Sequence, residues 1–135
     1  MNQTVRFVSS YPIEKVEWGR FVICGEVHGV AGDGEVIGAG KDIIVYQNKV
    51  VPWHQRKGHL MTREILFPAL NLEPDILIIG NGFNGMLEVP DALTAELMKE
   101  KPITIIVSRT PEACGLYNDL FTQNKDAVLA AHATC

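Results

Sequence analysis

An apolar segment that runs into a glycine-rich turn constrains the fold of this 135-residue chain most strongly. Four large aliphatic residues, 76–79, precede residues 80–85, whose glycines follow a G-x-G-x-x-G spacing. This pattern is typical of a buried strand that ends in a tight turn, and dinucleotide-binding proteins use it to approach a phosphate. Those proteins begin a helix directly after the glycines, whereas Pro90 suits only the first turn of a later helix. We therefore expect a strand-end loop, without NAD(P) binding.

From residue 62 onward, helical and strand-like patterns alternate. Helices are expected from Thr62, over residues 90–101 and from Thr110, with buried strands over 76–79 and 103–107. The third helix is the clearest, because Thr110 can cap it, Pro111 suits its first position and apolar residues follow at helical spacing. Pro68 should end or kink the first helix within about two turns. The alternation favours an α/β layer with parallel strands. Residues 127–131 are expected to form only an edge strand, because alanine has weak strand propensity.

The first 61 residues favour short antiparallel strands. Val5 and Phe7 alternate with polar residues, residues 21–23 are rich in strand formers, and residues 43–51 have the pattern of a hairpin. Residues 32–34, Gly-Asp-Gly, give the strongest turn signal. Together these patterns predict a single α/β domain over residues 1–135, mainly β over 1–61 and alternating α and β over 62–135.

Composition limits the classes of partner. With 47% hydrophobic and 21% charged residues, the chain is expected to be globular with a substantial core. A net charge of −4 argues against a nucleic-acid-binding protein, because such affinity comes mainly from clustered Lys and Arg. Residues 43–63 nevertheless lack acidic residues and contain several basic ones. This basic segment is either a solvated loop or a surface for an anion or an acidic partner.

Cysteine usage and the N-terminal residues favour a cytoplasmic location. Three cysteines without a C-x-x-C pair, Cys24, Cys114 and Cys135, fit a reducing compartment better than a disulfide framework. The N-terminal residues lack the apolar core of a secretory signal, and Glu14 and Glu17 are unusual in an organellar transit peptide. No apolar run approaches the roughly 18 residues of a membrane span, so we expect no membrane partner.

The loops after the two buried strands contain the candidate ligand-binding residues. A right-handed crossover through the helix at 90–101 places both loops at one edge of the sheet, where α/β proteins usually bind ligands. Arg109 and the N-terminus of the third helix favour an anion there. The predicted site comprises Gly80, Asn81, Gly82, Arg109 and Thr110. Each also has a structural explanation: turns for the glycines, a helix cap for Thr110 and a surface charge for Arg109.

No set of catalytic or metal-ligating residues emerges from the spacing, so no catalytic residue, metal or cofactor is predicted. The four histidines lack metal-binding spacing and are expected to be exposed or locally hydrogen-bonded: His28, His54, His59 and His132. Cys114 lies in the first turn of the third helix, where a thiol can be reactive, but buried packing is favoured. Trp53 is expected in the core, and Asn118 could hold a neighbouring segment through its amide.

Several short motifs together resemble a small α/β domain family. They are residues 74–82, Val89-Pro90, Thr110, Ala113 and Tyr117-Asn118-x-Leu120, in this order. The family is known from the adipogenesis-associated domain-containing protein and a mitochondrial respiratory complex I assembly factor. Trp18-Gly19, Lys41-Asp42, Trp53 and residues 132–135 look like the adipogenesis-associated branch.

The resemblance implies a three-layer α/β domain with a mixed central sheet, helices packed on it and an added β hairpin. It carries over no catalytic residues. Asn124-Lys125-Asp126 stands where an arginine often follows the third helix in the family. A complex I role is not inferred, because no organellar targeting signal is found.

Two functional hypotheses follow from these observations. The first is a non-enzymatic protein-interaction or assembly-type protein with an unknown protein partner, marked by an exposed apolar patch near Trp53 and compatible with a homo-oligomer. The alternative is a protein, or an enzyme, that binds a small anionic ligand through the loops after residues 76–79 and 103–107.

Overall fold

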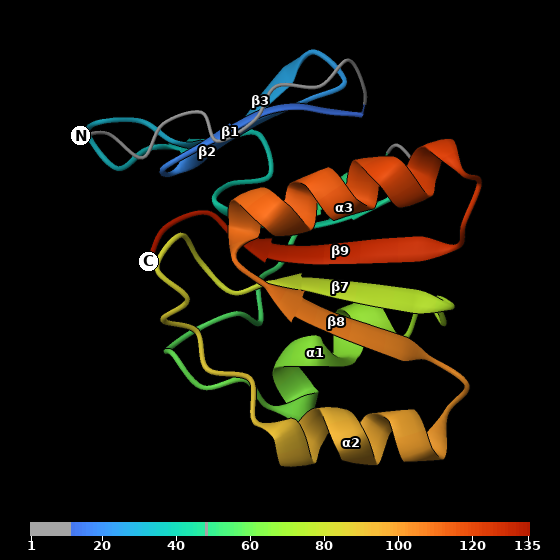
Figure 1. Cartoon of the computed structure of the whole chain (residues 1–135). Helices are drawn as coiled ribbons and strands as arrows, with labels where there is room; N and C mark the ends of the chain where they lie inside the picture. Colours follow the sequence, from blue (N-terminus) through green and yellow to red (C-terminus); the bar gives the residue numbers. More distant parts are fainter. Residues whose placement is uncertain (1–11, 48) are drawn as a thin grey trace.

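The computed structural model describes residues 12–47 and 49–135 and forms a mixed α/β fold (Figure 1). The strand expected around Val5 and Phe7 lies outside the described residues. One sheet is antiparallel, with its strands in chain order: β1 (Ile13–Glu17), β2 (Arg20–Ile23), β3 (Glu26–Val30) and β4 (Val36–Ile37). The other sheet is mixed, in the order β6 (Lys49–Pro52), β5 (Asp42–Tyr46), β9 (Ala127–His132), β7 (Ile76–Gly80) and β8 (Thr104–Ser108).

Three helices pack on these sheets: α1 (Arg63–Leu70), α2 (Asp91–Glu100) and α3 (Thr110–Thr122). Figure 1 shows α3 on one face of the mixed sheet, between it and the antiparallel sheet, with α1 and α2 on the opposite face. Each face of the mixed sheet contributes to its own apolar cluster. The fold class is confirmed, and the mixed sheet draws strands from both sides of residue 62.

The parallel pair and the hairpin are confirmed. Strands β7 and β8 are parallel, with Gly80 opposite Ser108, and β5 and β6 form the expected antiparallel hairpin. The predicted position of the last strand is wrong. Instead of lying at an edge, β9 is central, antiparallel to β5 and parallel to β7. All six of its residues are buried, so the small size of its alanines, which lets both faces pack closely, outweighs their weak strand propensity.

Helix α1 begins as expected, because Ile65 N donates a hydrogen bond to Thr62 Oγ1 at 3.2 Å. It ends two residues after Pro68. Trp53 lies in the core at 2% exposure, and its indole Nε1 donates to the carbonyl of Ile65 at 2.7 Å. This position confirms Trp53 as a core residue, so the exposed apolar patch that would favour a protein-interaction role does not include this side chain.

Helix α3 begins one residue earlier than expected. Arg109 is the N-cap and Thr110 is already helical, because the Thr110 hydroxyl binds a neighbouring loop instead of capping the first turn. The expected role of Asn118 is confirmed. Its amide accepts from Ile13 N at 3.0 Å and donates to Ile13 O at 2.8 Å, which fastens the antiparallel sheet to α3.

The central position of β9 predicts a strong sensitivity to side-chain size. Ala130 is 0% exposed, so Ala130→Leu adds volume to a packed core and should lower the free energy of unfolding by about 1–3 kcal/mol. Val107→Leu on β8, where Val107 is 38% exposed, is the control and should change stability little. Chemical denaturation measures both variants, and equal effects would contradict the central packing of β9.

Candidate functional site

The candidate site lies at one edge of the mixed sheet, where the carboxyl ends of three parallel strands meet. Gly80 lies opposite Ser108 of β8 and opposite Ala131 of β9. The antiparallel strand β5 begins at the same edge, with Asp42 opposite His132. The loops after β7 and β8 therefore meet the segments around Asp42 and His132, and Figure 1 shows the C-terminus beside these loops.

The structure brings the five predicted site residues together. Gly82 N donates to Thr110 Oγ1 at 2.9 Å, and Thr110 N donates to Gly82 O at 3.1 Å. A Cβ atom on Gly80 would lie 3.0 Å from Thr110 Oγ1, so these two residues are in close contact. Arg109 and Asn81 both lie beside Gly85.

Thr110 and Gly82 already contact other parts of the protein and are not free to contact a ligand. The Thr110 side chain is fully buried and also donates to the carbonyl of His132 at 2.6 Å. Gly82 has φ +104°, and a Cβ atom there would lie 2.3 Å from the carbonyl of Cys135. The glycine thus allows residues 134–135 to pack against this loop. Within the predicted set, Arg109 is exposed, and Asn81 Oδ1 is buried without a hydrogen-bond partner.

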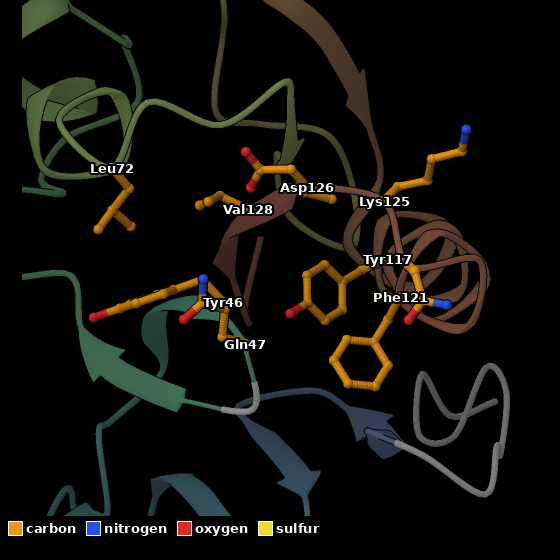
Figure 2. A pocket seen from close by; sticks show the side chains of 10 residues that line it. Tyr46, Gln47, Leu72, Tyr117, Phe121, Lys125, Asp126 and Val128 are labelled. Carbon is orange, nitrogen blue, oxygen red and sulfur yellow. The ribbon is translucent and has the colours of Figure 1, made fainter.

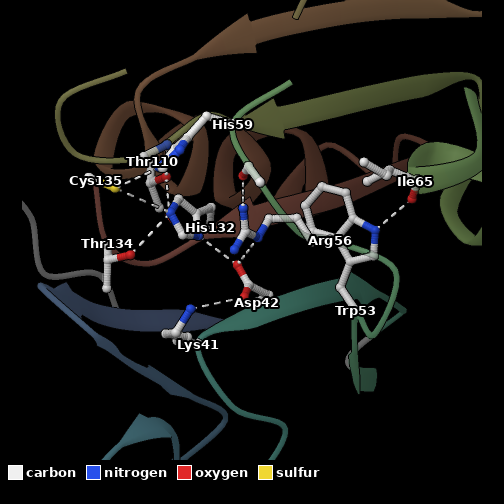
Figure 3. Close-up of polar contacts among 12 residues, drawn as sticks. Lys41, Asp42, Trp53, Arg56, His59, Ile65, Thr110, His132, Thr134 and Cys135 are labelled. Atoms are coloured by element: carbon white, nitrogen blue, oxygen red, sulfur yellow. Dashed lines mark hydrogen bonds and ion pairs between the residues drawn. The ribbon is translucent and has the colours of Figure 1, made fainter. Parts of the chain in front are cut away.

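A buried carboxylate–imidazole pair lies next to these residues (Figure 3). His132 is 2% exposed, and its Nδ1 lies 2.6 Å from Asp42 Oδ1. Because a carboxylate can only accept, this geometry assigns the proton to Nδ1 and leaves Nε2 as an acceptor. The Thr134 hydroxyl lies 3.0 Å from that Nε2 and can donate to it.

Two cations flank the same carboxylate. Arg56 Nε lies 2.9 Å from Asp42 Oδ1, as an ion pair rather than a well-directed hydrogen bond, and Lys41 Nζ lies 3.3 Å from Oδ2. Burial alone would raise the pKa of Asp42. The hydrogen bond from His132 and the positive charges of Arg56 and Lys41 outweigh burial, so the pKa of Asp42 lies below its ordinary value.

A thiol lies on the other side of His132. Cys135 Sγ is 4.0 Å from His132 Nε2 and 3.3 Å from His59 Nε2. His59 is exposed and Cys135 is half-buried. Cys114, in contrast, is fully buried in α3, where burial raises the pKa of its thiol, which confirms the expected packing role.

Sequence reasoning located this edge of the sheet but missed most of its polar side chains. Asp42 and His132 are 90 positions apart, and His59 and Cys135 are 76 apart, so no spacing rule connects them. His132 was expected only as an exposed or locally hydrogen-bonded histidine. The available signal was the strand over residues 127–132, which as a central parallel strand ends at the same edge.

Two pockets of similar size lie at different ends of the mixed sheet. A pocket of about 390 Å³ adjoins the Asp42 cluster and is lined by residues of the β4–β5 turn together with Lys41, Asp42, His54 and Arg56. Another pocket, of about 420 Å³, lies where β9 begins, between Tyr46 and Tyr117 (Figure 2). Lys125 and Asp126 carry opposite charges at its rim, so only the first pocket has an excess of positive charge.

The described part of the chain contains neither a metal-binding cluster nor a membrane-spanning helix. Within residues 12–47 and 49–135, no three His, Cys, Asp or Glu side chains are grouped so that they could hold a metal ion. The helices of that part are all too short or too polar to span a membrane.

The depressed pKa of Asp42 predicts a specific acid sensitivity. The folded state gains stability from this carboxylate above its unfolded pKa, near about 4, and loses that gain as the pH falls through the lower folded pKa. Between about pH 5 and pH 2, the free energy of unfolding of the wild type should therefore fall more steeply than that of Asp42→Asn. Denaturation at each pH tests this, with Asp119→Asn on the exposed face of α3 as control. Parallel curves for the wild type and Asp42→Asn would contradict it.

Solved structures share this fold. A conserved hypothetical protein, PH1505 from Pyrococcus horikoshii OT3, is 24% identical, with a TM-score of 0.71 over 93% of this chain and 100% of that one. A protein described as an outer membrane protein from Bartonella henselae is 21% identical, with a TM-score of 0.70 over 96% of this chain and 100% of that one. XCC1710 from Xanthomonas campestris is 14% identical, with a TM-score of 0.67 over 93% and 86%. At these identities the likeness concerns the fold alone.

Sequence comparison gives the family. No curated protein matches the chain. The sequence profile of the family described as "Protein of unknown function (DUF498/DUF598)" matches residues 13–132, which include every strand and helix of the structure. The chain therefore belongs to the DUF498/DUF598 family.

Proposed function

We propose that this protein binds a small anionic molecule at the edge of the mixed sheet, in the pocket beside Asp42. The observation that supports the proposal is an imbalance of charge. Lys41 and Arg56 both carry permanent positive charge and share the single carboxylate of Asp42. One positive charge is therefore left over beside the pocket, and an anion could neutralise it.

The size of the pocket and the burial of Arg56 agree with such a ligand. A volume of about 390 Å³ lies within the range of about 300–1,000 Å³ that is common for small-molecule sites. The Arg56 side chain is only 10% exposed, and its NH1 donates to the carbonyl of Gly58, which fixes the guanidinium in place. A fixed and poorly solvated guanidinium interacts more strongly with an anion than a mobile surface lysine does.

Arg109, Asn81 and the glycines of the loop after β7 could extend this site. Arg109 is the exposed cation of the predicted set and lies beside Gly85 and Asn81 at the same edge of the sheet. The buried, unpartnered Asn81 Oδ1 is an acceptor that a ligand hydroxyl or amine could satisfy. The loops after β7 and β8 therefore remain part of the proposal.

Binding of simple anions tests the proposal. Isothermal titration calorimetry with inorganic phosphate and with succinate should show binding to the wild type and a loss of about tenfold in Lys41→Gln, because one charge-assisted contact is removed. Lys99→Gln on the exposed face of α2 is the matched control and should bind like the wild type.

Arg109→Ala separates the two parts of the edge. Weaker binding in Arg109→Ala with unchanged binding in Lys41→Gln would place the anion at the loops after β7 and β8 rather than beside Asp42. No binding of either anion by the wild type, with native mass spectrometry showing no retained small molecule, would contradict the proposal.

A protein-interaction role is the second candidate, and the open edge of β8 favours it. Among the described residues, strand β8 pairs with β7 alone, contains neither a charged residue nor a proline, and exposes Val107 to 38%. Natural edge strands usually carry such residues to prevent pairing with another chain. We propose that a protein partner, or a second copy of this chain, adds a strand here.

A charge on β8 tests the second candidate. Val107→Lys places a charge on the open strand and should convert a dimer at micromolar concentration into a monomer in native mass spectrometry. Val36→Lys is the control, because Val36 is 65% exposed on the edge strand of the other sheet. A wild type that is already a monomer, and captures no protein partner through β8, would contradict strand addition.

The branch of the family to which the chain belongs and the cellular location of the protein are also proposals. We propose the adipogenesis-associated branch of the family, because three of the motifs that suggest it, Lys41-Asp42, Trp53 and residues 132–135, lie in or beside the Asp42 cluster. A cytoplasmic location is proposed from the unpaired cysteines, since Cys24, Cys114 and Cys135 are all free thiols.

A further inference from the structure

The geometry around Cys135 points to a function for this thiol: we propose that it exchanges with small anionic disulfides, with His59 accepting the thiol proton. Cys135 Sγ lies within hydrogen-bond distance of His59 Nε2, at 3.3 Å, and 4.0 Å from His132 Nε2. A thiol next to an imidazole base is the arrangement that converts cysteine into the nucleophilic thiolate.

His132 and Asp42 support the thiol from the buried side. The carboxylate of Asp42 holds the proton on His132 Nδ1, so Nε2 presents its lone pair toward Thr134 and Cys135. In this orientation the Nε2 atom of His132 can interact with the thiol proton of Cys135. Asp42 contacts His132 but not the thiol, so Asp42 is a positioning residue for His132.

The loop that covers Cys135 favours disulfide exchange over acyl transfer. An acyl substrate develops an oxyanion that needs unpaired N–H donors close to the nucleophile. The N–H groups of residues 82–87 are all used within the protein. Gly82 donates to Thr110 Oγ1, Phe83 to Thr134 O, Asn84 and Met86 to Cys135 O, Gly85 to Gly82 O, and Leu87 to Asn81 O. Disulfide exchange spreads negative charge over sulfur atoms and needs no such donors.

The reaction balances without any further oxidant. Cys135 gives its proton to His59, and the thiolate attacks one sulfur of the external disulfide. A new S–S bond forms to Cys135 while the external S–S bond breaks, and the released thiolate leaves with the bonding pair and can take the proton from His59. A second external thiol reverses the step, because Cys114 is fully buried and cannot resolve the mixed disulfide.

The expected preference for an anionic disulfide rests on the proposed anion-binding function. Lys41 and Arg56 lie on the far side of the Asp42–His132 pair from Cys135 and provide the positive surplus. The pocket beside Asp42 does not include Cys135, so these cations act on a disulfide with carboxylate groups by attracting its negative charge to this edge of the sheet. The reactivity of the thiol itself depends only on His59, His132 and Asp42.

Two chromogenic disulfides test both the reactivity of Cys135 and the preference for an anionic disulfide. The full chain with Cys24→Ser, which removes the exposed thiol, is treated at pH 7 with dianionic dithiobis(nitrobenzoate) and with neutral dithiodipyridine. Each rate is divided by the rate of the same reagent with free cysteine. We expect normalised rates above one, a higher value for the dianion, and peptide mass spectrometry that places the adduct on Cys135.

Variants identify the proton acceptor. His59→Asn should lower the rate with both reagents by about tenfold, because the thiolate loses its nearest base, whereas Gln55→Ala in the same exposed loop, outside the pocket beside Asp42, should not. Asp42→Asn should move the half-maximal rate to higher pH, a readout that a purely structural role would not change. Cys135→Ser should abolish the fast reaction, and the circular dichroism spectrum of each variant verifies folding.

The outcomes separate this inference from the proposed function. A normalised rate near one in the native protein, equal to that of the urea-unfolded chain, would overturn the thiol proposal even if phosphate binding is intact. Fast exchange at Cys135 without preference for the dianion would overturn the anionic substrate class alone. Fast exchange that is unchanged in His59→Asn would overturn the role of His59 as proton acceptor.

Discussion

The insertion of β9 between β5 and β7 is the constraint on which the rest of the structure depends. Because β9 is parallel to β7 and antiparallel to β5, its carboxyl end meets the carboxyl end of one neighbour and the amino end of the other. This arrangement brings His132 to Asp42 across 90 positions of sequence. An edge strand has only one neighbour, so an edge β9 could not also join the Asp42–His132 pair to the loops after β7 and β8.

Local sequence patterns correctly predicted those helices and strands that depend on residues close together in the sequence. The cap at Thr62, the apolar period of α3 and the apolar runs of β7 and β8 gave helices and a parallel pair that the structure confirms. The order of the sheet is a long-range property, and the alanines of β9 indicated only a weak edge strand. The same limit applies to the site: the crossover between β7 and β8 identified the edge, whereas nothing in the spacing connected Asp42 with His132.

The charges around Asp42 are the physical basis of the proposed anion binding at this edge. Burying a carboxylate is costly unless it is hydrogen-bonded and paired, and His132, Arg56 and Lys41 together meet that requirement. Two permanent cations exceed what one carboxylate needs, however, and the mostly buried Arg56 is poorly placed to be solvated. A site that served stability alone would need only one of them, so the second cation is more consistent with a ligand than with packing.

The glycine motif and the thiol cluster are physically connected. In a phosphate-binding loop, glycine lets the backbone approach a ligand closely; here Gly82 lets it approach Cys135, and the Thr110 N–H at the start of α3 binds Gly82 O rather than an anion. The glycine motif therefore allows the same close backbone approach as in a phosphate-binding loop, but to the protein's own chain instead of a ligand. A substitution at Gly82 would displace Cys135 and destabilise the loop together, so it could not separate ligand binding from folding. Arg109, which is exposed at the same edge, can be changed without disturbing that packing and therefore gives the cleaner measure of what these loops bind.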